Sequence, residues 1–133
     1  MLGELVYESA GKRTGRRVIS TDGGFKVEVS FEGGGKMLGV DVQEIGTYTS
    51  QSRPDGTLFG EGQGVVIGAD GSMATWKGMG VGKFTGAGSV AYRGAVYLYS
   101  DSPKFNKLNG SALVFEFESD AQGNTRAKDW EWK

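Results

Sequence analysis

Two runs of alternating glycines are the feature that most limits how this chain can fold. The glycines occupy positions Gly60, Gly62, Gly64, Gly78, Gly80 and Gly82. Successive side chains of a β-strand point to opposite faces, so each run leaves one face of its strand bare. Glycine in a strand loses conformational entropy and packs against nothing, so its repeated use predicts sharp coiling or close backbone approach. The runs therefore predict a small, tightly closed β-structure.

The composition is that of a folded domain without a strong global charge. The chain has 133 residues, of which 38% are hydrophobic, and we expect a single β-barrel domain spanning residues 1–133. Its formal net charge of −1 predicts no general attraction to nucleic acid or to an anionic membrane. The segment Met1–Ala10 already carries Glu4 and Glu8, so we expect no signal peptide, no membrane span and a cytoplasmic location.

The chain contains no cysteine and no histidine. Disulfides, thiol nucleophiles, serine–histidine–aspartate triads and zinc sites built from these residues are therefore excluded. The glycine runs are not phosphate loops, because Gly82-Lys83 is followed by Phe84 rather than by serine or threonine. The dinucleotide fingerprint is also absent. We expect no cofactor and no metal, and any chemistry must use carboxylates, lysine, tyrosine, serine or bound water.

Alternation of apolar and polar residues predicts strands along the whole chain. Strands are expected at Glu4–Ala10, Arg16–Ser20, Phe25–Phe31, Met37–Ser50, Thr57–Ala69, Ser72–Phe84, Ser89–Ser100, Ser111–Ser119 and Thr125–Trp132. Turns are expected at Asp22–Gly24, Gly33–Gly35, Pro54–Gly56, Asp70-Gly71, Gly86–Gly88 and Gln122–Asn124. The pattern predicts an all-β fold, a single closed antiparallel barrel of about eight strands in meander order. One short helical turn is expected near 102–110, with Ser102 as its N-cap.

The turn signals also predict a strand register. If Asp70-Gly71 is a two-residue turn, Gly60 lies opposite Val81, and each glycine is covered by a larger side chain of the neighbouring strand. A slip of one residue would place glycine opposite glycine, so we prefer the interlocked register. Extended to the next hairpin, it pairs Gly80 with Arg93 and Trp76 with Tyr97.

This register collects a set of polar and aromatic side chains on one face. The candidate ligand-binding residues are Glu61, Trp76, Arg93, Tyr97 and Tyr99. Glu61 and Arg93 would flank the bare Gly80 and form an ion pair across it. If this face lines the interior, the barrel encloses a ligand site; if the opposite face does, these residues belong to the surface.

Two other groups have an ordinary structural interpretation. Glu116 and Glu118 alternate with Phe115 and Phe117, as on the outer face of a strand, although paired carboxylates also suit acid–base work. Trp130 and Trp132 share one face of the last strand, where they are expected to join the core or a subunit contact.

The segments Asp70–Gly82 and Gly88–Val96 resemble the central strands of the allene oxide cyclase-like barrels. This superfamily includes allene oxide cyclases, dirigent proteins and uncharacterised small bacterial relatives, and the chain looks most like the last group. The resemblance implies an eight-stranded antiparallel barrel with an elongated apolar cavity, and often a homo-oligomer. It transfers no catalytic residue to this chain, and a shared fold does not by itself give a shared function.

Three functions follow from the sequence. The first is a barrel that binds a small, partly apolar molecule in or at the mouth of its interior. The second is a cofactor-free isomerase or cyclase of the allene oxide cyclase type, which needs Glu61 inside the barrel and desolvated. The third is a structural or interaction module that acts through a homo-oligomer surface.

Overall fold

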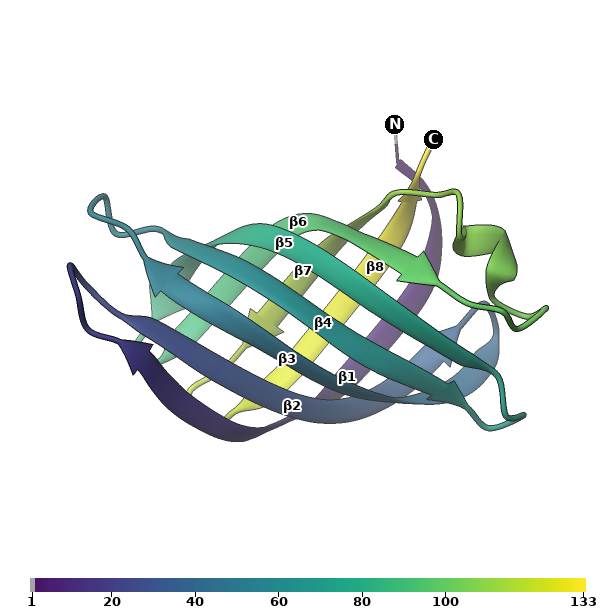
Figure 1. Ribbon diagram of the computed structural model, residues 1–133, viewed down its shortest axis with the longest axis horizontal. Coiled ribbons are helices and arrows are strands. Elements are labelled where there is room, and N and C mark those ends of the chain that lie inside the picture. The colour runs from purple at the N-terminus through teal and green to yellow at the C-terminus, as the bar shows by residue number, and fades with distance from the viewer. Residues whose placement is uncertain (1) are drawn as a thin grey trace.

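The structure is a computed structural model that describes residues 2–133 as a closed antiparallel barrel (Figure 1). The strands are β1 (Leu2–Ser20), β2 (Lys26–Met37), β3 (Val40–Ser52), β4 (Leu58–Gly68), β5 (Met73–Gly86), β6 (Ser89–Tyr99), β7 (Leu113–Ser119) and β8 (Asn124–Trp132). Each strand pairs with the next, and β8 pairs back with β1, so the sheet closes on itself. The all-β fold, the closed barrel and its meander order are confirmed.

The triple glycine Gly33–Gly35 was expected to form a turn, and this prediction is wrong. All three residues lie inside β2, where they pair with β1 on one side and with β3 on the other. A Cβ atom on Gly35 would lie 1.8 Å from the carbonyl oxygen of Glu8 on β1. Close approach of two strands, rather than a change of chain direction, therefore requires glycine here.

The chain reverses instead at Leu38-Gly39, which the sequence analysis placed inside a strand. Both residues have positive φ, 50° for Leu38 and 81° for Gly39, and Met37 pairs with Val40 across them. Two central residues with positive φ give a hairpin whose twist matches that of its strands. The predicted strand Met37–Ser50 is therefore divided between the end of β2 and most of β3.

The predicted register between β4 and β5 is wrong by one residue. Gly60 lies opposite Gly80, and Gly62 lies opposite Gly78. The connection is a three-residue loop, because the Gly68 N–H donates to the Ser72 carbonyl at 2.7 Å and Gly71 adopts a φ of 88°. The extra loop residue moves every pair by one position, and the glycine runs face each other.

The next pair of strands is displaced in the same way. Gly80 lies opposite Gly94 rather than Arg93, and Trp76 lies opposite Leu98 rather than Tyr97. The glycine runs and Trp76 lie on the same face of β4 and β5, and this face points into the barrel.

One end of the barrel is closed by the segment between β6 and β7 (Figure 1). It contains the short 3-10 helix η1 (Asn106–Leu108), which confirms the predicted helical turn. Phe105 and Leu108 are fully buried against strand residues that include Met37 and Leu113. Ser102 is not the N-cap, since the residue preceding η1 is Phe105; its hydroxyl accepts a hydrogen bond from the Met73 N–H instead. Within residues 2–133, no helix is long and apolar enough to cross a membrane.

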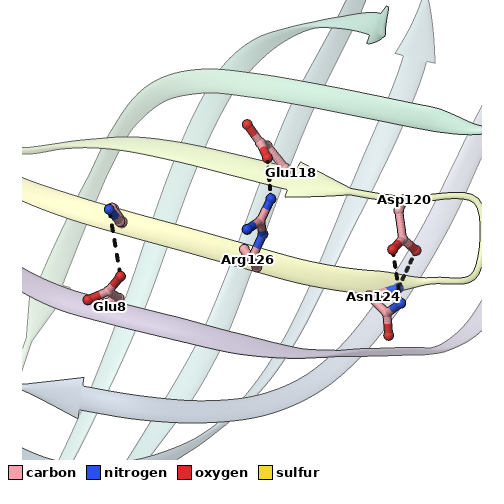
Figure 2. A network of polar contacts seen from close by, with 6 residues as sticks. Glu8, Glu118, Asp120, Asn124 and Arg126 are labelled. Atoms are coloured by element: carbon pink, nitrogen blue, oxygen red, sulfur yellow. Dashed lines mark hydrogen bonds and ion pairs between the residues drawn. The ribbon is translucent and has the colours of Figure 1, made fainter. Parts of the chain in front are cut away.

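Charged side chains of alternating sign form a belt around most of the outer surface. The cross-strand order from β6 through β7, β8, β1 and β2 to β3 is Arg93, Glu116, Lys128, Glu8, Lys36 and Asp41. Ion pairs join three pairs of these neighbours. Figure 2 shows part of this surface, with Glu8 on β1 and the neighbouring pair Arg126–Glu118. The expected outward direction of Glu116 and Glu118 is confirmed. Both carboxylates form ion pairs with arginines on the outside of the barrel.

Candidate functional site

The inward-facing glycines leave space for a cavity inside the barrel. The cavity has a volume of about 90 Å³. Part of its wall is bare backbone at Gly60, Gly62, Gly78 and Gly80. Side chains from seven strands complete the lining, among them Tyr7, Phe31, Glu44, Tyr48, Trp76, Tyr92, Phe115, Phe117 and Asp129. A cavity of this size holds a few water molecules or one small molecule.

The indole ring of Trp76 lies against backbone that carries no side chain. A Cβ atom on Gly64 would lie 2.3 Å from Trp76 Nε1, and one on Gly46 would lie 3.0 Å from Trp76 Cζ2. Alanine at Gly64 would displace the indole ring, whereas alanine at Gly46 would first meet Phe31, whose Cζ atom lies 2.5 Å from that Cβ position. Trp76 Nε1 is buried and has no hydrogen-bond partner among residues 2–133. A buried donor without an acceptor is rare in native proteins, so this N–H is a candidate contact for a bound molecule.

Four further aromatic rings stand beside Trp76 in the lumen. Phe31 lies 6.5 Å from Trp76, 6.1 Å from Tyr48 and 5.5 Å from Phe117, measured between ring centroids. Tyr92 lies 5.8 Å from Tyr48, and its hydroxyl is hydrogen-bonded to a serine of β3. All five rings line the cavity, and their separations are those of interacting aromatic pairs.

Two carboxyl groups face this aromatic lumen. Glu44 from β3 is 7% exposed and Asp129 from β8 is 8% exposed. The Tyr7 hydroxyl donates a hydrogen bond to Glu44 Oε1 at 2.9 Å. Neither carboxyl forms an ion pair with a lysine or arginine of residues 2–133. No group of three or more acidic side chains within these residues is arranged to hold a metal ion.

Burial shifts the titration of all three groups. It raises the pKa of Asp129 to about 8, and the nearby negative charge of Glu44 adds to the effect. Burial also raises the pKa of Glu44, while the Tyr7 hydroxyl and the Trp76 N–H oppose that shift by favouring the charged carboxylate. The pKa of Tyr7 is raised by burial and then by Glu44. Asp129 is therefore mostly neutral at pH 7 and can donate a hydrogen bond into the cavity.

The structure separates the five residues predicted to bind a ligand. Trp76 lies in the lumen, whereas Glu61, Arg93, Tyr97 and Tyr99 project from the outer face and are exposed. The expected pair of Glu61 with Arg93 is not formed, because Arg93 pairs with Glu116 of β7. Tyr97 lines an outer depression, and Glu61 borders both this depression and the lumen cavity. A binding role for the four outer residues stays a prediction.

Replacing Arg93 with alanine is expected to change stability by less than about 1 kcal/mol, because its ion pair with Glu116 is exposed on both sides. Urea denaturation measures this effect. Binding of small molecules to the lumen should be unchanged, since Arg93 does not line it. A loss of lumen binding in Arg93→Ala without a loss of stability would contradict this prediction.

No family model and no curated protein matches the chain, but solved structures do. A protein of unknown function from Clostridium acetobutylicum has a TM-score of 0.84 at 15% identity, covering 96% of each chain. A conserved protein of unknown function from Rhodopseudomonas palustris has a TM-score of 0.83 at 15% identity, covering 99% of each chain. A beta-barrel like protein from Acinetobacter baumannii has a TM-score of 0.83 at 12% identity, covering 100% of this chain and 96% of the other. What these proteins share is the barrel fold.

The sequence analysis missed both lumen carboxyls of the barrel. In β8, the outward residues Arg126 and Lys128 put Asp129 on the inner face and Trp130 on the outer one. That charge alternation was a usable signal, but the two tryptophans suggested the opposite orientation. Trp132 is 61% exposed, so the core interpretation is wrong for it, while a subunit contact stays a prediction.

The inward direction of Glu44 could not be predicted from the sequence for a different reason. Its strand places Val42 and Glu44 inside and Ile45 outside, so apolar residues occur on both faces of β3. A period-two pattern then gives no direction for the glutamate. Only closure of the barrel, which brings the Tyr7 hydroxyl onto its carboxylate, identifies Glu44 as an inner residue.

Proposed function

We propose that this protein binds a small, partly apolar molecule in the lumen of the barrel. The observation that carries the proposal is the buried Trp76 N–H, which has no acceptor among residues 2–133 and borders a mainly apolar cavity that contains several aromatic rings. An apolar pocket with a few convergent polar groups is the usual form of a small-molecule site. Glu44 and Asp129 supply the other polar contacts.

Trp76→Phe is expected to weaken ligand binding roughly tenfold, because it removes one buried hydrogen-bond donor worth about 1–2 kcal/mol. Thermal-shift and two-dimensional NMR titrations with small neutral and charged organic molecules measure the effect. The matched control is Trp132→Phe, the same replacement at an exposed outer position. The proposal fails if no molecule shifts the Trp76 indole signal, or if both variants bind as the wild type does.

A cofactor-free isomerase of the allene oxide cyclase type is the second candidate. The sequence-based hypothesis requires Glu61 as the catalytic carboxyl, but this side chain is exposed on the outer face. Asp129 offers a replacement, because a buried carboxyl with a pKa of about 8 can exchange a proton near neutral pH. Conversion of a bound compound by the wild type and not by Asp129→Asn would favour this candidate over simple binding.

A further inference from the structure

We propose that the ligand of the lumen is a small organic cation, such as a methylated or short-chain ammonium group. This inference rests on the proposed function and specifies the chemical class of the molecule bound. It follows from the charges, the aromatic rings and the size of the cavity.

The charges of the lumen are uncompensated. Glu44 and Asp129 are both buried, and neither has a basic partner within residues 2–133. Ionising a buried carboxyl without a partner costs several kcal/mol, so two of them in one cavity disfavour each other's charged form. A cation placed between them would supply the missing charge inside a low-dielectric site, where its attraction to a carboxylate is strong.

Glu44 is already arranged to act as a carboxylate. The Tyr7 hydroxyl donates to its Oε1 atom, and the Trp76 N–H also favours its charged form. The hydrogen bond from Tyr7 stabilises a negative charge on Glu44 more than it stabilises the neutral acid. The Trp76 N–H makes no hydrogen bond to Glu44 and acts on its charge only by lying nearby.

The aromatic rings provide the second half of a cation site. Seven aromatic rings line the same cavity as the carboxyls, those of Tyr7, Phe31, Tyr48, Trp76, Tyr92, Phe115 and Phe117. A cation is attracted to the face of an aromatic ring within about 6 Å of its centroid, most strongly to tryptophan and more strongly when water is excluded. Aromatic rings with a nearby carboxylate bind ammonium groups better than they bind neutral molecules of the same shape.

The cavity also limits the size of the ligand. A volume of about 90 Å³ restricts the ligand to a molecule of a few heavy atoms. Tetramethylammonium, the smallest quaternary ammonium ion, serves as the probe, and it has no proton of its own to lose. The neutral molecule tert-butanol has nearly the same size and shape and gives the matched control.

The pH dependence follows from the groups that face Asp129. These are Glu44 from β3, whose charge raises the pKa of Asp129, and Tyr7 from β1, whose own pKa is raised by burial. Tyr48 and Tyr92 lie in the same cavity, and the arginines Arg13 and Arg16 act on Tyr48. Since all three tyrosines have raised pKa values, the proton released on cation binding below pH 8 comes from the carboxyls.

NMR titration of the Trp76 indole signal, assigned with Trp76→Phe, tests the inference. We expect tetramethylammonium to bind the wild type at pH 8 at least about tenfold more tightly than tert-butanol does. Its affinity should rise up to about tenfold between pH 6 and pH 7, because Asp129 must lose a proton. In Asp129→Asn the affinity for tetramethylammonium should fall about tenfold and lose most of its pH dependence, while that for tert-butanol stays unchanged.

The outcomes separate this inference from the proposed function. If tert-butanol binds as tightly as tetramethylammonium or more tightly, the proposal of a cationic ligand is wrong, but the lumen still binds a small molecule. Wild-type affinity for tetramethylammonium in Asp129→Asn also overturns the proposal of a cationic ligand. If neither probe moves the Trp76 signal, the proposal of a cationic ligand is wrong. The titrations with small neutral and charged organic molecules described above then decide whether the lumen binds any molecule.

Discussion

Gly35→Ala is expected to destabilise the barrel by about 3 kcal/mol or more, a large effect for the addition of one methyl group. The new Cβ atom would lie 1.8 Å from the Glu8 carbonyl oxygen and 2.9 Å from the Ser9 Cα atom. Both contacts are with backbone, which cannot move aside as a flexible side chain can. Relief requires β1 and β2 to separate, and this breaks their hydrogen-bonded ladder.

Gly15→Ala in the same hairpin is the control for this experiment. A Cβ atom on Gly15 would meet nothing within 4 Å, and its φ is not in the left-handed region. Alanine there should be neutral, or stabilise by about 0.5 kcal/mol by restricting the unfolded chain. Urea denaturation of the two variants gives the comparison. Equal midpoints would show that β1 and β2 do not approach as closely as the structure has them.

Between pH 5 and pH 9, Asp129→Asn is expected to gain about 4 kcal/mol of stability relative to the wild type. The pKa of Asp129 is about 8 in the folded protein and its ordinary value is 3.8. Between these values the folded state holds a proton that the unfolded state has released. Wild-type stability therefore falls as the pH rises through this window, by roughly 1.4 kcal/mol per pH unit at most.

Asparagine keeps the shape of the side chain and has no proton to lose, so the variant should lack this part of the pH dependence. Glu44 contributes with the same sign and remains in both proteins. Three exposed aspartates have pKa values lowered by hydrogen bonds and titrate below pH 5; they are Asp55, Asp70 and Asp120. Chemical denaturation from pH 5 to 9 measures the difference, and parallel profiles for the two proteins would contradict a buried, proton-holding Asp129.

The faces of individual strands were largely predictable, because the pleat fixes which residues share a face. Glu116 and Glu118 were expected outside, opposite Phe115 and Phe117, and the structure has them so. The relation between strands was less predictable. One extra residue in the loop before Ser72 shifts the pairing by one position and places four of the six glycines opposite one another, Gly60 with Gly80 and Gly62 with Gly78.

The glycine runs illustrate the same division at the candidate site. The prediction that a larger side chain lies directly opposite every glycine is wrong, because Gly60 and Gly62 lie opposite Gly80 and Gly78. Aromatic rings cover only some of the glycines. Tyr92 covers Gly60 and Gly82, and Trp76 covers Gly64. Gly64 and Gly82 lie directly opposite these rings on the adjacent strand, whereas Tyr92 reaches Gly60 from two strands away. The reach of an aromatic ring across a curved sheet is not contained in strand pairing alone.

The sequence by itself determined an all-β chain, its closure into a barrel, the position of the helical turn and the bare face of each glycine strand. These depend on local preferences and on a period of two, which neighbouring residues carry. The tertiary structure alone decided that the bare face points inward and that Glu44, Asp129 and Trp76 share one cavity. Those residues come from β3, β8 and β5, and only the register and the curvature of the closed sheet bring them together.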